Sequence, residues 1–264
     1  MKRNLLVLVI AVSTLACEHV LDSEPPYEPR IVVYGSLEWG IRFSRILRLN
    51  EEVDVRRFLF PRIEVEGYVA DDRSRQPLIR RGEGFYTCAL LLVDGETYTL
   101  FATWEGKRVT ARVTKPHSPR IDTLWGNVVA DSNSFTFTWN LSFVPRAGEG
   151  YRAIFGALLD TSEIFFYGVD SLTIVNAGTD GRIRITASQR SSYPPNTRPP
   201  RALTARVVAY DWNYFQYYIS LPREGGSLPL YVISGGPLES NVEGDGVGIV
   251  WSESASQRTY PLQP

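Results

Sequence analysis

Strict alternation of apolar and polar residues in short runs is the feature that most constrains this chain. In the clearest run, residues 135–143, one face carries Phe135, Phe137, Trp139, Leu141 and Phe143. A period of two belongs to a β-strand with one buried face and does not fit the 3.6-residue period of a helix. The run therefore predicts a core strand.

Similar runs follow one another along most of the chain. They are separated by glycine, proline and polar residues at intervals of about 8 to 12 residues, which is typical of β-sandwiches rather than of alternating strands and helices. Residues 97–104 and 108–114, joined at Glu105-Gly106-Lys107, predict a hairpin. We expect an all-β fold of two tandem β-sandwich units, immunoglobulin/fibronectin-like or transthyretin-like.

A proline-rich segment, Lys115-Pro116-His117-Ser118-Pro119, is the expected joint between the units. It divides the chain into a first sandwich at 30–116 and a second at 117–264. One short helix is predicted within the second, at 211–221. There Asp211 suits the N-cap, and Trp212, Phe215 and Ile219 share one apolar face.

The N-terminus has the pattern of a secretory leader. Lys2 and Arg3 precede an apolar stretch that ends at Ala16, and this stretch is shorter than the ~20 residues that span a bilayer. We expect a signal peptide at 1–16. Cys17 follows directly, as in a bacterial lipobox, so we expect its thiol to carry lipid. Cleavage that leaves Cys17 as a plain thiol is the alternative.

Residues 17–29 are polar and rich in proline, which suits an extended tether between the lipidated cysteine and the folded body. The lipid-anchored form would be held at the cell outer membrane, on its periplasmic or cell-surface face.

Composition argues against several kinds of chemistry. With 28 basic and 29 acidic residues, the formal net charge is −1, so nucleic acid is not expected as a partner. Only two histidines, His19 and His117, are available for a catalytic triad or a zinc site. Cys88 lies in an apolar run and is expected in the core. We predict no catalytic residue, no metal ligand and no cofactor.

Two further patterns are candidates for binding sites. Residues 241–246 place two carboxylates among glycines but lack the remaining acids of a calcium loop, so we expect a turn. Among six tryptophans, Trp139 and Trp212 are assigned to the core. Trp39, beside Gly40, is the best candidate for an exposed ligand- or partner-binding residue.

The order of these pieces resembles the domain of unknown function 4249 lipoproteins of Bacteroidota. The segments that carry the resemblance are Cys17-Glu18 and residues 30–35, 84–86, 95–98, 119–124, 214–218 and 241–249. Val250-Trp251 and the scarcity of lysine depart from the family pattern. The resemblance implies an outer-membrane lipoprotein without established activity, whose relatives often look like accessories of TonB-dependent receptors.

The expected function is that of a non-enzymatic binding or accessory module for an outer-membrane, TonB-dependent-type receptor. Loops 191–201 and 235–246 are the segments expected to contact such a partner. The alternative is a surface carboxylate-dependent glycan hydrolase or a glycan-binding protein. A converging acid pair in a deep cleft would favour the enzyme, whereas a flat aromatic surface or a sheet edge would favour the binding protein.

Overall fold

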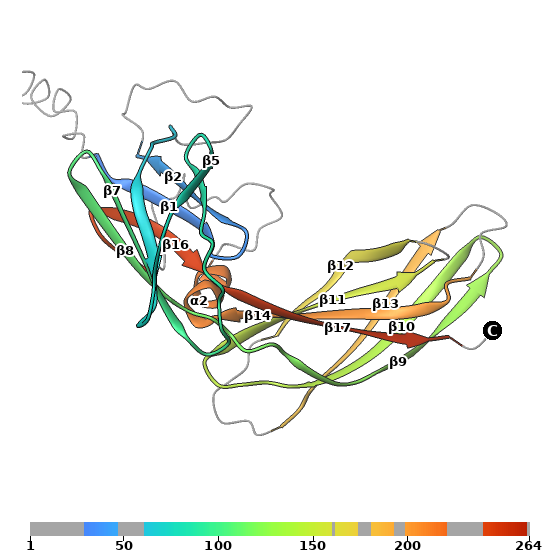
Figure 1. The fold of residues 1–264 in the computed structure, drawn as a ribbon. Helices are drawn as coiled ribbons and strands as arrows, with labels where there is room; N and C mark the ends of the chain where they lie inside the picture. Colours follow the sequence, from blue (N-terminus) through green and yellow to red (C-terminus); the bar gives the residue numbers. More distant parts are fainter. Residues whose placement is uncertain are drawn as a thin grey trace, which may run out of the picture.

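Four β-sheets and one short helix make up the described part of the chain in the computed structural model (Figure 1). The structure describes residues 29–46, 61–159, 162–173, 181–192, 199–220 and 240–262. The predicted leader, Cys17 and most of the tether lie outside these residues.

The strands follow in chain order, with the helix between β14 and β15. They are β1 (Ile31–Ser36), β2 (Gly40–Arg45), β3 (Glu66–Ala70), β4 (Arg75–Pro77), β5 (Ile79–Gly82), β6 (Phe85–Thr87), β7 (Thr97–Trp104), β8 (Lys107–Thr114), β9 (Arg120–Asp131), β10 (Ser134–Val144), β11 (Glu149–Leu158), β12 (Glu163–Thr173), β13 (Ile183–Ser192), β14 (Ala202–Asp211), α2 (Trp212–Ser220), β15 (Val242–Gly244), β16 (Gly246–Trp251) and β17 (Glu253–Pro261).

The four sheets form two units, each with its own core. The first unit combines the sheets β16-β1-β2-β6-β5 and β15-β8-β7-β3-β4, and the second combines β13-β10-β9 and β12-β11-β14-β17. Each pair of sheets encloses a separate cluster of buried apolar side chains. The prediction of an all-β, sandwich-type fold is therefore confirmed. Assignment of each unit to an immunoglobulin, fibronectin or transthyretin type stays a prediction.

Strand β10 has the buried face that its alternation predicts. Phe137, Trp139 and Phe143 are fully buried. The indole of Trp139 stacks on Phe137 at a centroid distance of 5.6 Å, and its Nε1 donates to the carbonyl of Gly156 at 2.9 Å. The one polar atom of this side chain is thus satisfied within an apolar core.

The predicted hairpin of β7 and β8 is present, with Trp104 paired to Lys107. Glu105 and Gly106 at its tip both have positive φ, 46° and 78°. Two such residues make the tight turn whose twist matches that of the flanking strands.

The tail of the chain returns to the first unit, which corrects the predicted boundary of 117–264. Strand β16 runs parallel to β1, from Ile31 opposite Gly246 to Ser36 opposite Trp251, and β15 pairs with β8. Val242 and Val250 are consequently part of the first core. The apolar run at 247–251 indicates a strand but not its partner, because pairing across such a sequence distance leaves no local signal.

Helix α2 begins where the sequence predicts. The Asp211 Oδ1 accepts hydrogen bonds from the backbone N–H groups of Asn213, at 3.0 Å, and Tyr214, at 3.2 Å, as an N-cap should. Phe215 is fully buried. Its ring lies where a side chain at Gly150 of β11 would stand. Because glycine has no Cβ, the helix can pack against β11 at this position.

Trp212 does not lie in the core, contrary to the expectation. Its side chain is 40% exposed, although its ring contacts Phe215 at a centroid distance of 5.5 Å. The helix turns Phe215 and Tyr217 inward instead. This rotation is set by the close approach to Gly150, which the helical period alone does not reveal.

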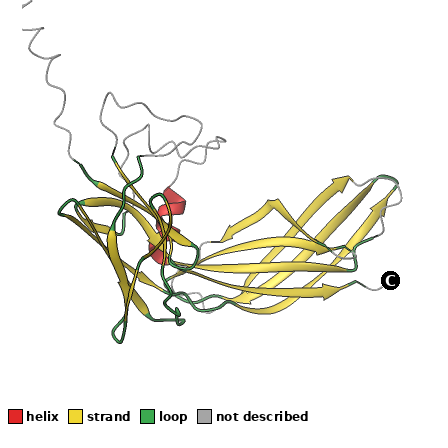
Figure 2. Ribbon diagram, turned by 45° about the horizontal axis from the view of Figure 1, so that its top comes forward, coloured by secondary structure: helices red, strands yellow, loops and turns green. Residues whose placement is uncertain are grey.

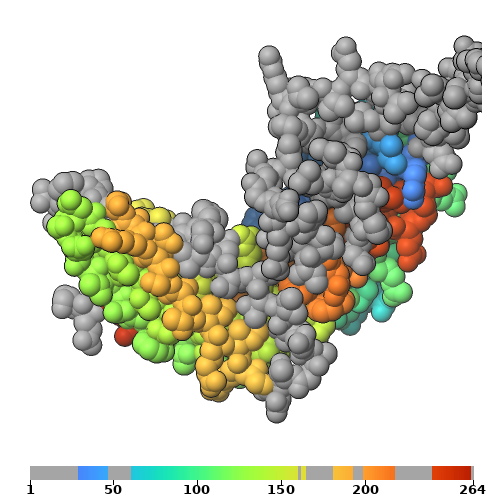
Figure 3. Space-filling model, turned by 180° about the vertical axis from the view of Figure 1, so that it is seen from behind, coloured from blue at the N-terminus to red at the C-terminus, as the bar shows by residue number. Residues whose placement is uncertain are grey.

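The two units meet at an angle, so that the molecule is bent (Figures 2 and 3). The chain passes between them three times: from β8 to β9, from β14 to β15, and from β16 to β17. The helix lies at this junction (Figure 1). Repeated crossing restricts how one unit can move against the other.

Candidate functional site

A network of buried polar groups fills the joint between the units. Lys115 Nζ lies 2.8 Å from Glu38 Oε1 and also donates to the carbonyl of Glu253. The same Glu38 oxygen accepts hydrogen bonds from the Ser252 hydroxyl and, at 3.2 Å, from the Glu253 N–H. Ser252 is fully buried. These contacts link β17 and the segment after β8 to the turn between β1 and β2.

Asp211 connects the helix to the same network. Its Oδ2 accepts the Ser252 N–H at 2.9 Å, while its Oδ1 caps α2. Burial raises the pKa of this carboxyl from 3.8 to about 6, against the effect of its backbone hydrogen bonds, and the charge of Glu38 adds to the rise. The joint therefore holds a carboxyl that titrates in mildly acidic solution.

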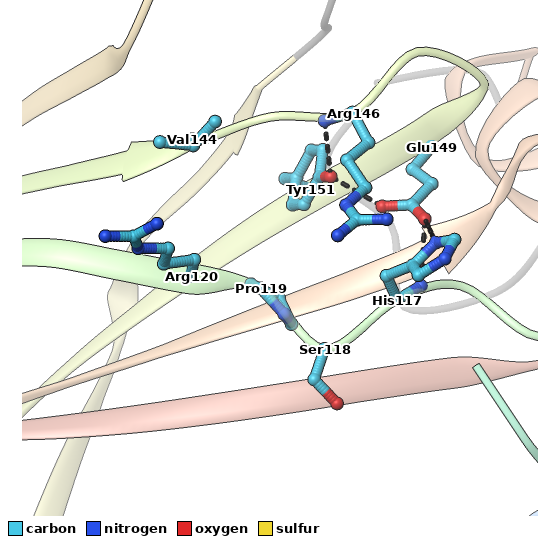
Figure 4. Close-up of a pocket in the computed structure, with 8 residues that line it drawn as sticks. All are labelled: His117, Ser118, Pro119, Arg120, Val144, Arg146, Glu149 and Tyr151. Carbon is cyan, nitrogen blue, oxygen red and sulfur yellow. Dashed lines mark hydrogen bonds and ion pairs between the residues drawn. The ribbon is translucent and has the colours of Figure 1, made fainter. Parts of the chain in front are cut away.

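A cavity of about 170 Å³ opens beside the joint (Figure 4). Its lining residues come from the segment between β8 and β9 with the start of β9, and from the end of β10, the turn after it and the start of β11; they are His117, Ser118, Pro119, Arg120, Val144, Arg146, Glu149 and Tyr151.

Glu149 organises the inner wall of this cavity. Its Oε1 accepts hydrogen bonds from the backbone N–H of His117, at 2.8 Å, and lies 3.0 Å from the ring Nδ1. Its Oε2 accepts the Tyr151 hydroxyl at 2.6 Å, and the Tyr151 oxygen accepts the Arg146 N–H at 2.8 Å. Burial and the bond to Glu149 raise the pKa of Tyr151. Both carboxylate oxygens are occupied in orienting neighbours.

The ring of His117 lies close to the turn at Gly95, although its side chain is 38% exposed. A Cβ built on Gly95 would lie only 3.0 Å from His117 Nε2. The arrangement of His117, Glu149 and Tyr151 is suited to fixing the joint.

The sequence-predicted site residues fall in different places. Cys17 lies outside the described residues. Trp39, in the turn between β1 and β2, is 66% exposed as expected, and its Nε1 donates to Glu253 Oε1 at 2.8 Å. Its role as a ligand- or partner-binding residue stays a prediction. Cys88 is partly buried against the first core, and burial raises the pKa of its thiol.

The two loops expected to contact a partner are described only in part. Residues 193–198 and 235–239 lie outside the described chain. In the described end of the second loop, residues 242–244 form β15 and Gly246 begins β16, and Gly244 at the turn between them has a φ of 91°. The Asp245 carboxylate there accepts the Arg108 N–H at 2.9 Å. Within the described chain, no cluster of three or more His, Cys, Asp or Glu residues is arranged to hold a metal ion.

The sequence pattern did not predict a further surface, the outward side of the sheet β13-β10-β9, which we call the open face. While alternate residues of β10 enter the core, Thr136, Thr138 and Asn140 point the other way. Pairing sets Asn140 opposite Trp125 and Thr186, Thr138 opposite Asn127 and Ser188, and Thr136 opposite Val129 and Arg190.

The open face carries exposed apolar groups among polar ones. Trp125 and Val129 are each 57% exposed. In Figure 3 the green atoms of β9 and β10 and the light orange atoms of β13 lie side by side on the second unit. The polar positions of β10 and β13 are readable in the sequence, but aligning them with Trp125 requires the strand register.

No protein-family model matches the sequence, and a search of curated proteins finds no match. The fold itself defines an all-β protein of two joined sandwiches. In the described chain, no helix has the length and apolarity required to cross a membrane.

Proposed function

We propose that the protein is an outer-membrane lipoprotein, anchored through an acylated Cys17, that serves as a non-enzymatic binding module and an accessory of an outer-membrane, TonB-dependent-type receptor. The leader, the cysteine and the proline-rich tether support the anchor. The resemblance to the lipoprotein family supports the role beside a receptor.

The open face is the observation that carries the binding role. It presents an exposed tryptophan, Trp125, among hydroxyl and amide side chains. Exposed apolar groups rimmed by polar residues mark interaction surfaces. Hydrolysis by carboxylates instead needs two acids facing each other across a substrate cleft, about 5 to 10 Å apart.

The state of Glu149 favours binding over turnover as well. It lines the cavity at the joint, yet both its oxygens accept hydrogen bonds from His117 or Tyr151. A general acid or nucleophile must have an oxygen directed at the substrate. Glu149 therefore acts as a positioning residue within the protein.

The test is capture from detergent-solubilised membranes of the source cells with the tagged full chain and its Cys17→Ser variant. We expect an outer-membrane receptor to co-purify with the wild type. Intact-mass analysis should find an acylated chain that begins at Cys17, and the variant should be released or left unprocessed.

Two results would overturn the proposal. An unacylated chain that begins elsewhere would remove the anchor. Failure of any outer-membrane protein to co-purify, combined with cleavage of a glycan library that is lost in Glu149→Gln, would replace binding by the hydrolase alternative.

A further inference from the structure

We propose that the open face binds a neutral oligosaccharide, with Trp125 as the stacking platform. This inference rests on the proposed function and names the ligand class of its binding surface. It is carried by the side chains of β9, β10 and β13 and by their register.

Residues paired across β9, β10 and β13 form rows on the open face, and the two central rows are those of Trp125 and of Asn127. These rows carry an aromatic ring beside hydrogen-bonding groups. Trp125 is paired with Asn140, and Asn127 follows two residues later on the same side of β9. Paired residues on neighbouring strands lie about 5 Å apart, so these side chains reach a single bound ring. A sugar ring has one face of C–H groups, which stacks on an indole, and a rim of hydroxyl groups, which seeks donors and acceptors.

Asn140 is oriented for this task. The Thr186 hydroxyl donates to its Oδ1 at 2.9 Å, which turns the two N–H donors of Nδ2 away from that bond. One row along, the Ser188 hydroxyl donates to the carbonyl of Phe137 at 3.2 Å and keeps its lone pairs as acceptors. Donors thus lie in the row that holds Trp125, and acceptors lie in the row beside it.

The two central rows of the open face carry no charge, which suits a neutral ligand. The rows of Trp125 and Asn127 contain only uncharged side chains across all three strands. In the next row, the guanidinium of Arg190 is paired with Asp131 at 3.0 Å and donates to the Ser134 hydroxyl at 3.0 Å. On the other side, beside the row of Trp125, Arg184 stands opposite Ser142. The two central rows themselves hold no counter-charge for a charged glycan, whereas a neutral one needs none.

The same composition disfavours a protein as occupant. The cores of protein interfaces are depleted in serine and rich in several large aromatic and arginine side chains, and serine and threonine are under-represented among their energetic hot spots. At its centre the open face offers one aromatic ring beside serine, threonine and asparagine, with Val129 and Arg190 in an outer row. Its chemistry fits a polyhydroxylated ligand.

Affinity electrophoresis of the full chain through gels that contain soluble neutral polysaccharides tests the inference. The probes are a β-glucan, xylan, galactomannan and starch, with polygalacturonate as the acidic comparison. We expect retardation by at least one neutral polysaccharide and about tenfold weaker binding in Trp125→Ala. Asn140→Ala should weaken binding less.

Trp212→Ala is the matched control, because Trp212 is also a partly exposed tryptophan but lies on α2, away from the open face. It should bind as the wild type does. Circular dichroism and thermal unfolding show whether each variant is folded. Absence of retardation by every neutral polysaccharide, unchanged binding in folded Trp125→Ala, or retardation by polygalacturonate alone would overturn the inference.

Receptor capture with Trp125→Ala separates this inference from the proposed function. If the receptor is captured by wild type and variant while no polysaccharide binds, only the glycan inference fails. If a polysaccharide binds through Trp125 and no receptor is captured, the accessory role fails and the glycan site stands. Loss of receptor capture in Trp125→Ala without polysaccharide binding would make the open face a protein-docking surface and overturn the inference.

Discussion

Trp139 is the residue on which packing of the second core is most directly tested. It is fully buried, stacks on Phe137 and satisfies the carbonyl of Gly156. We expect Trp139→Ala to lower the free energy of unfolding by about 3 to 5 kcal/mol, since truncation removes buried area and leaves a cavity. Denaturant unfolding measures this loss. Trp212→Ala, at a partly exposed site, should cost less than about 1 kcal/mol; a similar loss in both variants would contradict the placement of Trp139.

Asp211 makes stability depend on pH. Its pKa is raised from 3.8 to about 6 by burial, so the folded protein binds this proton more tightly than the unfolded chain. The associated stabilisation is complete below pH 3.8 and is lost as pH rises through about 6. The difference between the two values corresponds to about 3 kcal/mol.

We therefore expect the free energy of unfolding of the wild type to fall relative to that of Asp211→Asn as pH rises across this window. Asparagine keeps a side-chain oxygen to cap α2 but does not titrate. Unfolding curves at several pH values measure the effect, and Asp131→Asn, at an exposed position, is the control. Parallel pH profiles of wild type and Asp211→Asn would refute the expectation.

At the scale of elements, the sequence predicts what is decided locally. The alternation in β10, the hairpin of β7 and β8, and the Asp211 cap of α2 are all found, because each depends on neighbours within a few residues. Which elements pair or pack with each other is not decided locally. The sequence pattern does not show that β16 joins β1, that α2 turns Trp212 outward, or that Trp125 stands opposite Asn140, since register and packing decide these.

Gly248 tests the pairing of β16 with β1. It has a φ of 137°, and a Cβ built on it would lie 1.8 Å from the carbonyl oxygen of Val33. Gly248→Ala must therefore separate the two strands, and we expect a loss of at least about 2 kcal/mol in the free energy of unfolding. Hydrogen exchange should show faster exchange of amides in β1. Gly82→Ala, where a Cβ meets nothing within 4 Å, should be close to neutral; equal effects of the two variants would speak against this pairing.

At the scale of the whole molecule, the joint determines where the open face stands relative to the tether. The tether precedes β1 in the first unit, whereas the open face belongs to the second. Three chain crossings and the contacts of Glu38 with Lys115 and Ser252 hold the two units together. A rigid joint would hold the binding surface in a fixed orientation, while a loose one would let it swing.

Lys115→Met should loosen this joint. The Lys115 and Glu38 side chains are only 11% and 18% exposed, so removal of the cation leaves a largely buried carboxylate without its counter-charge, at a cost of about 3 kcal/mol. Spin labels at Glu105→Cys and Ser132→Cys, one in each unit, report the distance between the units once Cys17 and Cys88 are replaced. We expect one narrow distance distribution in the otherwise wild-type chain and a broader one in Lys115→Met.

Adding Glu38→Gln removes the unpaired charge and should recover part of the stability, whereas Lys107→Met, in the distant hairpin, should change neither measurement. An equally narrow distribution in folded Lys115→Met would mean that the chain crossings alone fix the angle between the units.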